Sequence, residues 1–171
     1  MYRSITLSTL AIAVFSGALW NSREPIRPPG LSKNAAPLNW VQELSKIAPP
    51  EFDGQLHATI TEEAAEQFKA TMAFYKRGAC QMAIPGLMET LELDSRAIDA
   101  RFYLGICLVM SGETEQGELV LEDTVAWGNT VFREPALVYG AHANLKLYRV
   151  ARAHAMLLDA GESLSDMLAE P

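Results

Sequence analysis

The side chains of this chain that could carry metal or redox chemistry are two cysteines and three histidines. They are Cys80, Cys107, His57, His142 and His154. None of them stands at the short Cys and His spacings of a zinc site, so we expect no bound metal. The two cysteines allow two interpretations. They form a disulfide if the chain is exported to an oxidising compartment, or they are buried free thiols.

Seven residues between positions 94 and 123 carry carboxylates, which can act as general acids or bases. We interpret them as a solvated acidic surface: Asp94, Asp99, Glu113, Glu115, Glu118, Glu122 and Asp123. No glycine-rich phosphate loop, nucleophile elbow or metal-binding helix accompanies them. The sequence therefore predicts a protein that is not an enzyme and that uses no cofactor.

The overall composition is that of one folded domain. Of the 171 residues, 49% are hydrophobic and 20% are charged, which is too apolar a mixture for a disordered chain. The formal net charge of −7 gives no electrostatic attraction to a phosphate backbone. Nucleic acid is therefore not an expected partner.

Residues 97–121 predict two helices joined by a glycine turn. Apolar side chains such as Phe102 and Ile106 recur three or four positions apart, which is helical spacing. Gly112 follows the last apolar residue and can take the left-handed conformation that ends a helix. Gly105 lies inside the first helix, where a glycine predicts close approach of another backbone.

The same pattern recurs on both sides, at spacings of 34 and 36 residues. Gly112 corresponds to Gly78 in one direction and to Tyr148 in the other. A small residue follows each turn position by five residues: Ala83, Gly117 and Ala153. A helix pair repeated at this period is typical of a helical solenoid. The predicted fold is all-α, with three helix pairs at about residues 61–96, 97–131 and 134–168.

The period and the small, large and turn positions resemble the tetratricopeptide repeat (TPR) over roughly residues 61–168. Residues 49–52, 67–75, 83–85 and 100–106 are similar to one bacterial subgroup. In its members a zinc-finger module, like that of anti-sigma factors, precedes one transmembrane helix and a non-cytoplasmic TPR domain. The ligands of such a zinc finger would have to precede the hydrophobic run. Only residues 1–4 of this sequence precede that run, which is too few for the module. The resemblance therefore implies the topology and the TPR domain, and it does not imply anti-sigma activity.

Residues 1–20 predict a signal peptide or a membrane anchor. The uncharged run 5–20 would span about 24 Å as a helix, which is short of a hydrocarbon core of roughly 30 Å. Small residues at 16–18 favour cleavage by a signal peptidase, whereas Trp20 could hold an uncleaved helix at the interface. Both alternatives place the rest of the chain in the periplasm, either released or facing it from the membrane.

The chain after the hydrophobic run divides into two predicted parts. Residues 21–60 are expected to form a proline-rich linker, with a short helix near 38–48. Residues 61–171 are expected to form the TPR-like domain.

In TPR domains the first helix of each pair lines a concave groove, and the resemblance assigns twelve side chains to that groove. They are Phe68, Met72, Tyr75, Lys76, Phe102, Ile106, Val109, Met110, Val138, His142, Leu145 and Lys146. A groove this apolar suits an extended or helical peptide, so the predicted function is a non-enzymatic protein-interaction module.

Two alternatives to partner binding stay open. The helix near 38–48 could fold back and fill the groove, or several of the twelve residues could be core. A second possible function is tethering or sensing for a membrane signalling regulator. Binding of chaperone tails is not expected, because Phe68 and Met72 stand where the carboxylate-clamp TPRs carry Lys and Asn.

Overall fold

The computed structural model describes residues 39–161, and every regular element in this range is an α-helix. The helices are α1 (Asn39–Leu44), α2 (Glu62–Tyr75), α3 (Cys80–Leu93), α4 (Ile98–Ser111), α5 (Thr114–Ala126), α6 (Arg133–Lys146) and α7 (Val150–Ala160). The predicted all-α class is confirmed for these residues. The predicted signal or anchor and the end of the third repeat lie outside the described range. Between residues 39 and 161, no helix is long and apolar enough to cross a membrane.

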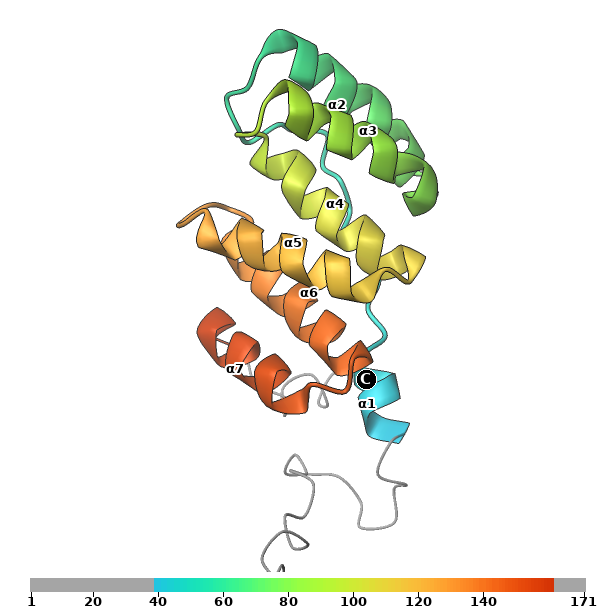
Figure 1. Ribbon diagram of the computed structural model, residues 1–171, viewed down its shortest axis with the longest axis vertical. Helices are drawn as coiled ribbons and strands as arrows, with labels where there is room; N and C mark the ends of the chain where they lie inside the picture. The colour runs from blue at the N-terminus through green and yellow to red at the C-terminus, as the bar shows by residue number, and fades with distance from the viewer. Residues whose placement is uncertain (1–38, 162–171) are drawn as a thin grey trace, which may run out of the picture.

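Helices α2 to α7 form three pairs that stack in chain order (Figure 1). Helix α2 packs on α3, α4 on α5, and α6 on α7, while α3–α4 and α5–α6 contacts join neighbouring pairs. The short α1 contacts α6, at the far end of the stack from α2. From α1, a non-helical segment drawn in teal runs back along the stack to the start of α2 (Figure 1).

Local sequence explains where the first helix of each pair begins or ends. Thr61 caps α2, because its side-chain oxygen accepts a hydrogen bond from the Ala64 N–H at 3.3 Å. The turn positions Gly78, Gly112 and Tyr148 all have positive φ, at 72°, 94° and 57°. The three helix pairs therefore turn in the same way, and Tyr148 adopts a conformation that glycine adopts more easily.

Helices α4 and α5 cross at two glycines. A Cβ atom on Gly117 would lie 2.8 Å from the carbonyl oxygen of Gly105 and 2.8 Å from the backbone nitrogen of Val109. A Cβ atom on Gly105 would lie 2.7 Å from the Leu121 Cγ. The predicted close backbone approach at Gly105 is thus present. The corresponding positions of the other pairs are also buried: Thr71, Ala83, Ala141 and Ala153.

Helix α4 is the most enclosed element of the stack. From Ile98 to Val109 every residue except Arg101 is buried. Its apolar side chains join the larger core with α2, α3 and α5, and a smaller core lies between α1, α6 and α7. Burial on all sides explains why this segment shows the strongest repeat pattern, since both of its faces are constrained by packing.

The predicted solvated acidic surface is wrong for three of its members. Asp94, Asp99 and Glu118 are 7%, 0% and 2% exposed. Each accepts hydrogen bonds in its buried position, which offsets the cost of removing a carboxylate from water. The other four remain exposed or half-buried: Glu113, Glu115, Glu122 and Asp123.

Candidate peptide-binding groove

The groove lined by α2, α4 and α6 is occupied by the chain itself. We call residues 48–60 the strap, because they run without regular secondary structure from the α6 end of the stack to the start of α2 (Figure 1). Side chains of α6, α2 and α4 hydrogen-bond to the strap backbone, in that order along the strap. The strap therefore covers the face of α2, α4 and α6 that the sequence assigned to the groove.

Two phenols, the buried Tyr75 and the half-buried Tyr139, hold carbonyl groups of the strap. The Tyr139 hydroxyl donates to the Ala48 carbonyl at 2.9 Å, and the Tyr75 hydroxyl donates to the Pro50 carbonyl at 2.5 Å. Burial raises the pKa of Tyr139 to about 12 and raises the pKa of Tyr75 above its ordinary value. Both phenols therefore stay protonated at neutral pH, and they remain donors.

Phe52 is the aromatic anchor of the strap. Its ring meets Phe68 of α2 and Tyr103 of α4 edge-on, with ring centroids 5.6 Å apart in both pairs. The Lys76 ammonium lies 4.9 Å from the centre of the same ring. This combination of edge-to-face and cation–π contacts makes the position selective for an aromatic side chain.

Asp99 holds two consecutive N–H groups of the strap. Its Oδ1 accepts from the His57 backbone N–H and its Oδ2 from the Ala58 backbone N–H, both at 2.9 Å. The His57 Nδ1 also lies 3.0 Å from Oδ1, and the His57 ring packs edge-on against Phe132 at 5.2 Å. One fully buried carboxylate thus fixes the register of the strap against α4.

Asp94 fixes the point where the strap becomes α2. Its Oδ2 accepts from the Thr61 backbone N–H at 3.0 Å, and its Oδ1 accepts from the Arg96 backbone N–H at 3.0 Å. The hydrogen bond from the Arg96 guanidinium holds the pKa of Asp94 well below its usual range. The carboxylate is therefore ionised at neutral pH and accepts from both backbone groups.

Helix α1 closes the groove at its α6 end. Val41 and Leu44 are buried in the small core with α6 and α7. His142 of α6 is 7% exposed. Burial lowers the pKa of His142 to about 4, and the charge of Lys146 acts in the same direction. His142 is therefore neutral at pH 7.

The twelve side chains predicted to line the groove are mostly covered. Eight are buried: Phe68, Met72, Tyr75, Phe102, Ile106, Val109, His142 and Leu145. Val138 and Lys146 are half-buried, and Lys76 and Met110 are exposed. Phe68, Tyr75 and Lys76 contact the strap, whereas Met72, Ile106 and Leu145 are at most 1% exposed and belong to the core.

The segment that covers the groove differs from the one that the sequence suggested, which was the helix near residues 38–48. The helix in that region is limited to α1, Asn39–Leu44, rather than residues 38–48, and it packs at the end of the groove. The groove itself is filled by the extended strap. Proline at 49 and 50 keeps residues 48 and 49 out of a helix, because the residue before a proline disfavours the helical conformation.

Sequence reasoning missed Asp99, Tyr103 and Tyr139 as groove residues. A signal was present in α4, since Asp99 and Tyr103 stand four residues apart and thus share one face of a mostly apolar helix. Tyr139 had no comparable signal, because its partner carbonyl is 91 residues away.

In the part of the chain that the structure describes, no three His, Cys, Asp or Glu side chains gather to hold a metal ion. Comparison of the chain with protein-family models, curated proteins and solved structures finds no match. The geometry of the groove is therefore the basis for assigning a function.

Proposed function

We propose that this chain is a non-enzymatic interaction module, built as a TPR-like solenoid, whose groove binds an extended segment of a partner protein. The observation that carries the proposal is that side chains of α2, α4 and α6 all hydrogen-bond to the backbone of one extended peptide, the strap. The shared turn conformation at Gly78, Gly112 and Tyr148 supports the repeat assignment.

The groove binds an extended peptide through hydrogen bonds to the backbone of the peptide. Tyr139 and Tyr75 donate to carbonyl groups, and Asp99 accepts from two adjacent N–H groups. These contacts are independent of the peptide side chains, as in other modes of extended-peptide recognition. Specificity comes from the site around Phe52, so the preferred partner segment carries an aromatic residue at this register.

The strap is a shallow occupant of the groove. Five of its consecutive residues, 53–57, are exposed, and only Phe52, Ala58 and Ile60 contribute half-buried apolar side chains to the core. Because the strap is joined directly to α2, it competes with any partner at an effective concentration in the millimolar range. The strap thus acts as an internal competitor, and a partner displaces it by burying more apolar surface.

The test is to weaken the strap and to supply its own sequence in trans. The probe is a fluorescently labelled peptide of residues 47–60, and binding is followed by anisotropy. The Phe52→Ala full-length chain should bind this peptide roughly tenfold more tightly than the wild type, because losing a half-buried aromatic side chain weakens the internal competitor by roughly 1.4 kcal/mol. Leu56→Ala is the matched control, since Leu56 lies on the same strap but is 39% exposed.

A second variant identifies the site of binding. In the Phe52→Ala background, Asp99→Ala should remove peptide binding, because the two peptide N–H groups lose their acceptor. Circular dichroism verifies that each variant is folded. If the Phe52→Ala chain is folded and binds no peptide, the strap is a permanent part of the core, and the groove accepts no partner.

We also propose that the module acts at the outer face of a membrane or in the periplasm, on the basis of the uncharged run at residues 5–20. An uncleaved anchor should keep the protein in the membrane fraction after alkaline extraction. A cleaved signal should give a mature N-terminus just after Ala18 on N-terminal sequencing. A full-length chain that stays soluble with Met1 intact would contradict both forms of this proposal.

A further inference from the structure

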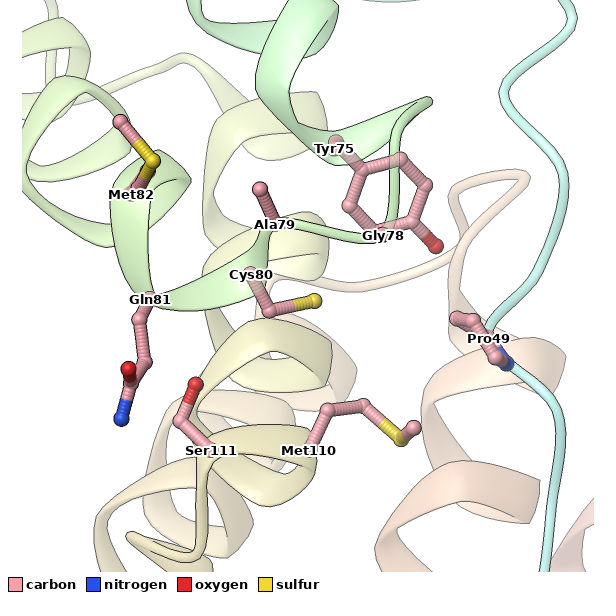
Figure 2. A pocket seen from close by; sticks show the side chains of 9 residues that line it. All are labelled: Pro49, Tyr75, Gly78, Ala79, Cys80, Gln81, Met82, Met110 and Ser111. Atoms are coloured by element: carbon pink, nitrogen blue, oxygen red, sulfur yellow. The ribbon is translucent and has the colours of Figure 1, made fainter.

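A cavity of about 510 Å³ lies beside the first residues of the strap. Pro49 of the strap and Tyr75 of α2 line it together with Met82 of α3 and Met110 of α4. In Figure 2, Pro49 lies on one side of the space and Met82 on the other, with Tyr75 and Met110 between them. Met82 and Met110 are 61% and 40% exposed, so the cavity opens to the surface beside them. The proline ring of the strap therefore borders a space that it does not fill.

The lining of this cavity is uncharged. Its larger side chains are two methionines and the Tyr75 ring, and methionine adapts its shape to different apolar groups. Gln81 and Ser111 add neutral polar groups, and Cys80 is present as a buried free thiol, as Cys107 is in α4. A charged group would lose water here without meeting an opposite charge, whereas an apolar group would leave water for apolar contacts. The cavity therefore suits a large apolar side chain.

Two hydrogen bonds fix the register of the strap at the cavity. The Tyr139 hydroxyl donates to the Ala48 carbonyl at 2.9 Å, and the Tyr75 hydroxyl donates to the Pro50 carbonyl at 2.5 Å. Pro49, which lines the cavity, stands between these two carbonyl groups. Both hydrogen bonds are made to the backbone, so another extended peptide can form them too. A peptide held in this register places the side chain that corresponds to Pro49 at the cavity.

We infer that the cavity is a second specificity site of the groove, and that the preferred partner segment carries a large apolar side chain at the register of Pro49. This inference rests on the proposed function, because it describes the same partner in more detail. The strap has a proline at this position, which is too short to fill the cavity. A partner with a longer apolar side chain buries surface that the strap leaves in contact with water. The partner can thereby displace the strap.

The experiment uses labelled peptides of residues 47–60 and the full-length Phe52→Ala chain, with binding followed by anisotropy. The Pro49→Leu peptide should bind roughly tenfold more tightly than the Pro49→Ala peptide, because its longer apolar side chain enters the cavity. The Pro49→Ala peptide is the matched reference, since both substitutions remove the proline ring and its fixed φ. A Pro49→Glu peptide should bind no better than this reference, because the lining offers no opposite charge. Equal affinities of the Pro49→Leu and Pro49→Ala peptides would overturn the inference.

A change in the chain locates the bound side chain. Met82→Glu, added to the Phe52→Ala chain, should lower the affinity for the Pro49→Leu peptide at least roughly fivefold, because it places a charge at the mouth of the cavity. Met88→Glu is the matched control, since Met88 is 51% exposed on the same helix and does not line the cavity. Equal effects of the two variants would place the peptide side chain outside the cavity and overturn the inference.

Substitutions in the intact strap separate a failure of this inference from a failure of the proposed function. With Phe52 retained, the full-length Pro49→Leu chain should unfold at a higher temperature than the Pro49→Ala chain, because the strap itself then fills the cavity. Equal unfolding temperatures would overturn the role of the cavity. If the Pro49→Leu chain is the more stable of the two but no peptide binds, the proposed function is wrong, and the inference about its partner is wrong with it.

Discussion

Asp99 of α4 and His142 of α6 are two polar residues that the fold buries. The Asp99 carboxyl group accepts hydrogen bonds from two backbone N–H groups of the strap, and His142 is buried on α6 at the α1 end of the groove. Both side chains are at most 7% exposed. Burial lowers the pKa of His142, so the stability of the fold depends on pH through this residue.

His142 predicts a loss of stability in mild acid. Its pKa is about 4 in the folded chain and about 6.5 when unfolded, so between these values the unfolded chain binds a proton that the folded chain does not. The contribution is therefore complete above pH 6.5 and declines as the pH falls toward 4. At pH 5 the expected loss is about 2 kcal/mol relative to pH 7.

The measurement is urea denaturation of the wild type and of His142→Gln at pH 7 and pH 5. The glutamine variant should lose less stability between the two values, because it has no titrating ring at this position. His154→Gln is the control, since His154 is exposed on α7. Parallel pH dependence of the wild type and His142→Gln would show that His142 is accessible to protons in the folded state.

At the scale of elements, the crossing of α4 and α5 depends on the absence of side chains. The backbones approach each other at Gly105 and Gly117, and helix α4 is packed on all sides. A glycine inside a helix costs roughly 1 kcal/mol relative to alanine, so its presence at both positions is explained by the close contact. The same glycines give this repeat its clear pattern in the sequence.

Gly117→Ala should destabilise the protein by roughly 2–3 kcal/mol, because the new Cβ would meet the backbone atoms of Gly105 and Val109, which cannot move independently. Gly140→Ala on α6 is the matched control, since its Cβ would meet the end of the flexible Met156 side chain. That variant should change stability by less than about 1 kcal/mol. Thermal unfolding checks both, and equal effects would show that the α4–α5 crossing can widen.

At the scale of the whole molecule, the stack is joined by contacts between successive pairs. Glu118 of α5 is the clearest example. It is 2% exposed and accepts a hydrogen bond from Asn144 of α6 at 3.3 Å. Its carboxylate also lies 3.4 Å from the Arg149 guanidinium and 3.1 Å from the Arg152 guanidinium, which leads into α7. One buried carboxylate thus connects the second helix pair to the third.

Glu118→Ala should therefore loosen the third pair more than the first. The buried network loses its acceptor, and we expect a destabilisation of roughly 2–3 kcal/mol. This value is lower than for a fully buried ion pair, because both arginines are partly exposed. Hydrogen exchange should accelerate in α6 and α7 before α2 and α3. Glu115→Ala is the control, because Glu115 is exposed and its pair with Arg149 is weak. Uniform acceleration over all helices would indicate that the stack unfolds as one unit.

The sequence predicted the all-helical class and the main turns because these depend on neighbours within one or two helical turns. Apolar spacing marked the helices, and Gly78, Gly112 and Gly105 marked two ends and one close approach. Even Tyr148 was found by its register, although its residue type gives no turn signal.

The course of the strap followed from the three-dimensional arrangement alone, because an extended segment carries no periodicity that identifies its partner. Its contacts join residues that are 25 to 91 positions apart. The hydrogen-bond partners of Asp99 could not be predicted, since the donors that satisfy it belong to residues 57 and 58, some 41 or 42 positions away.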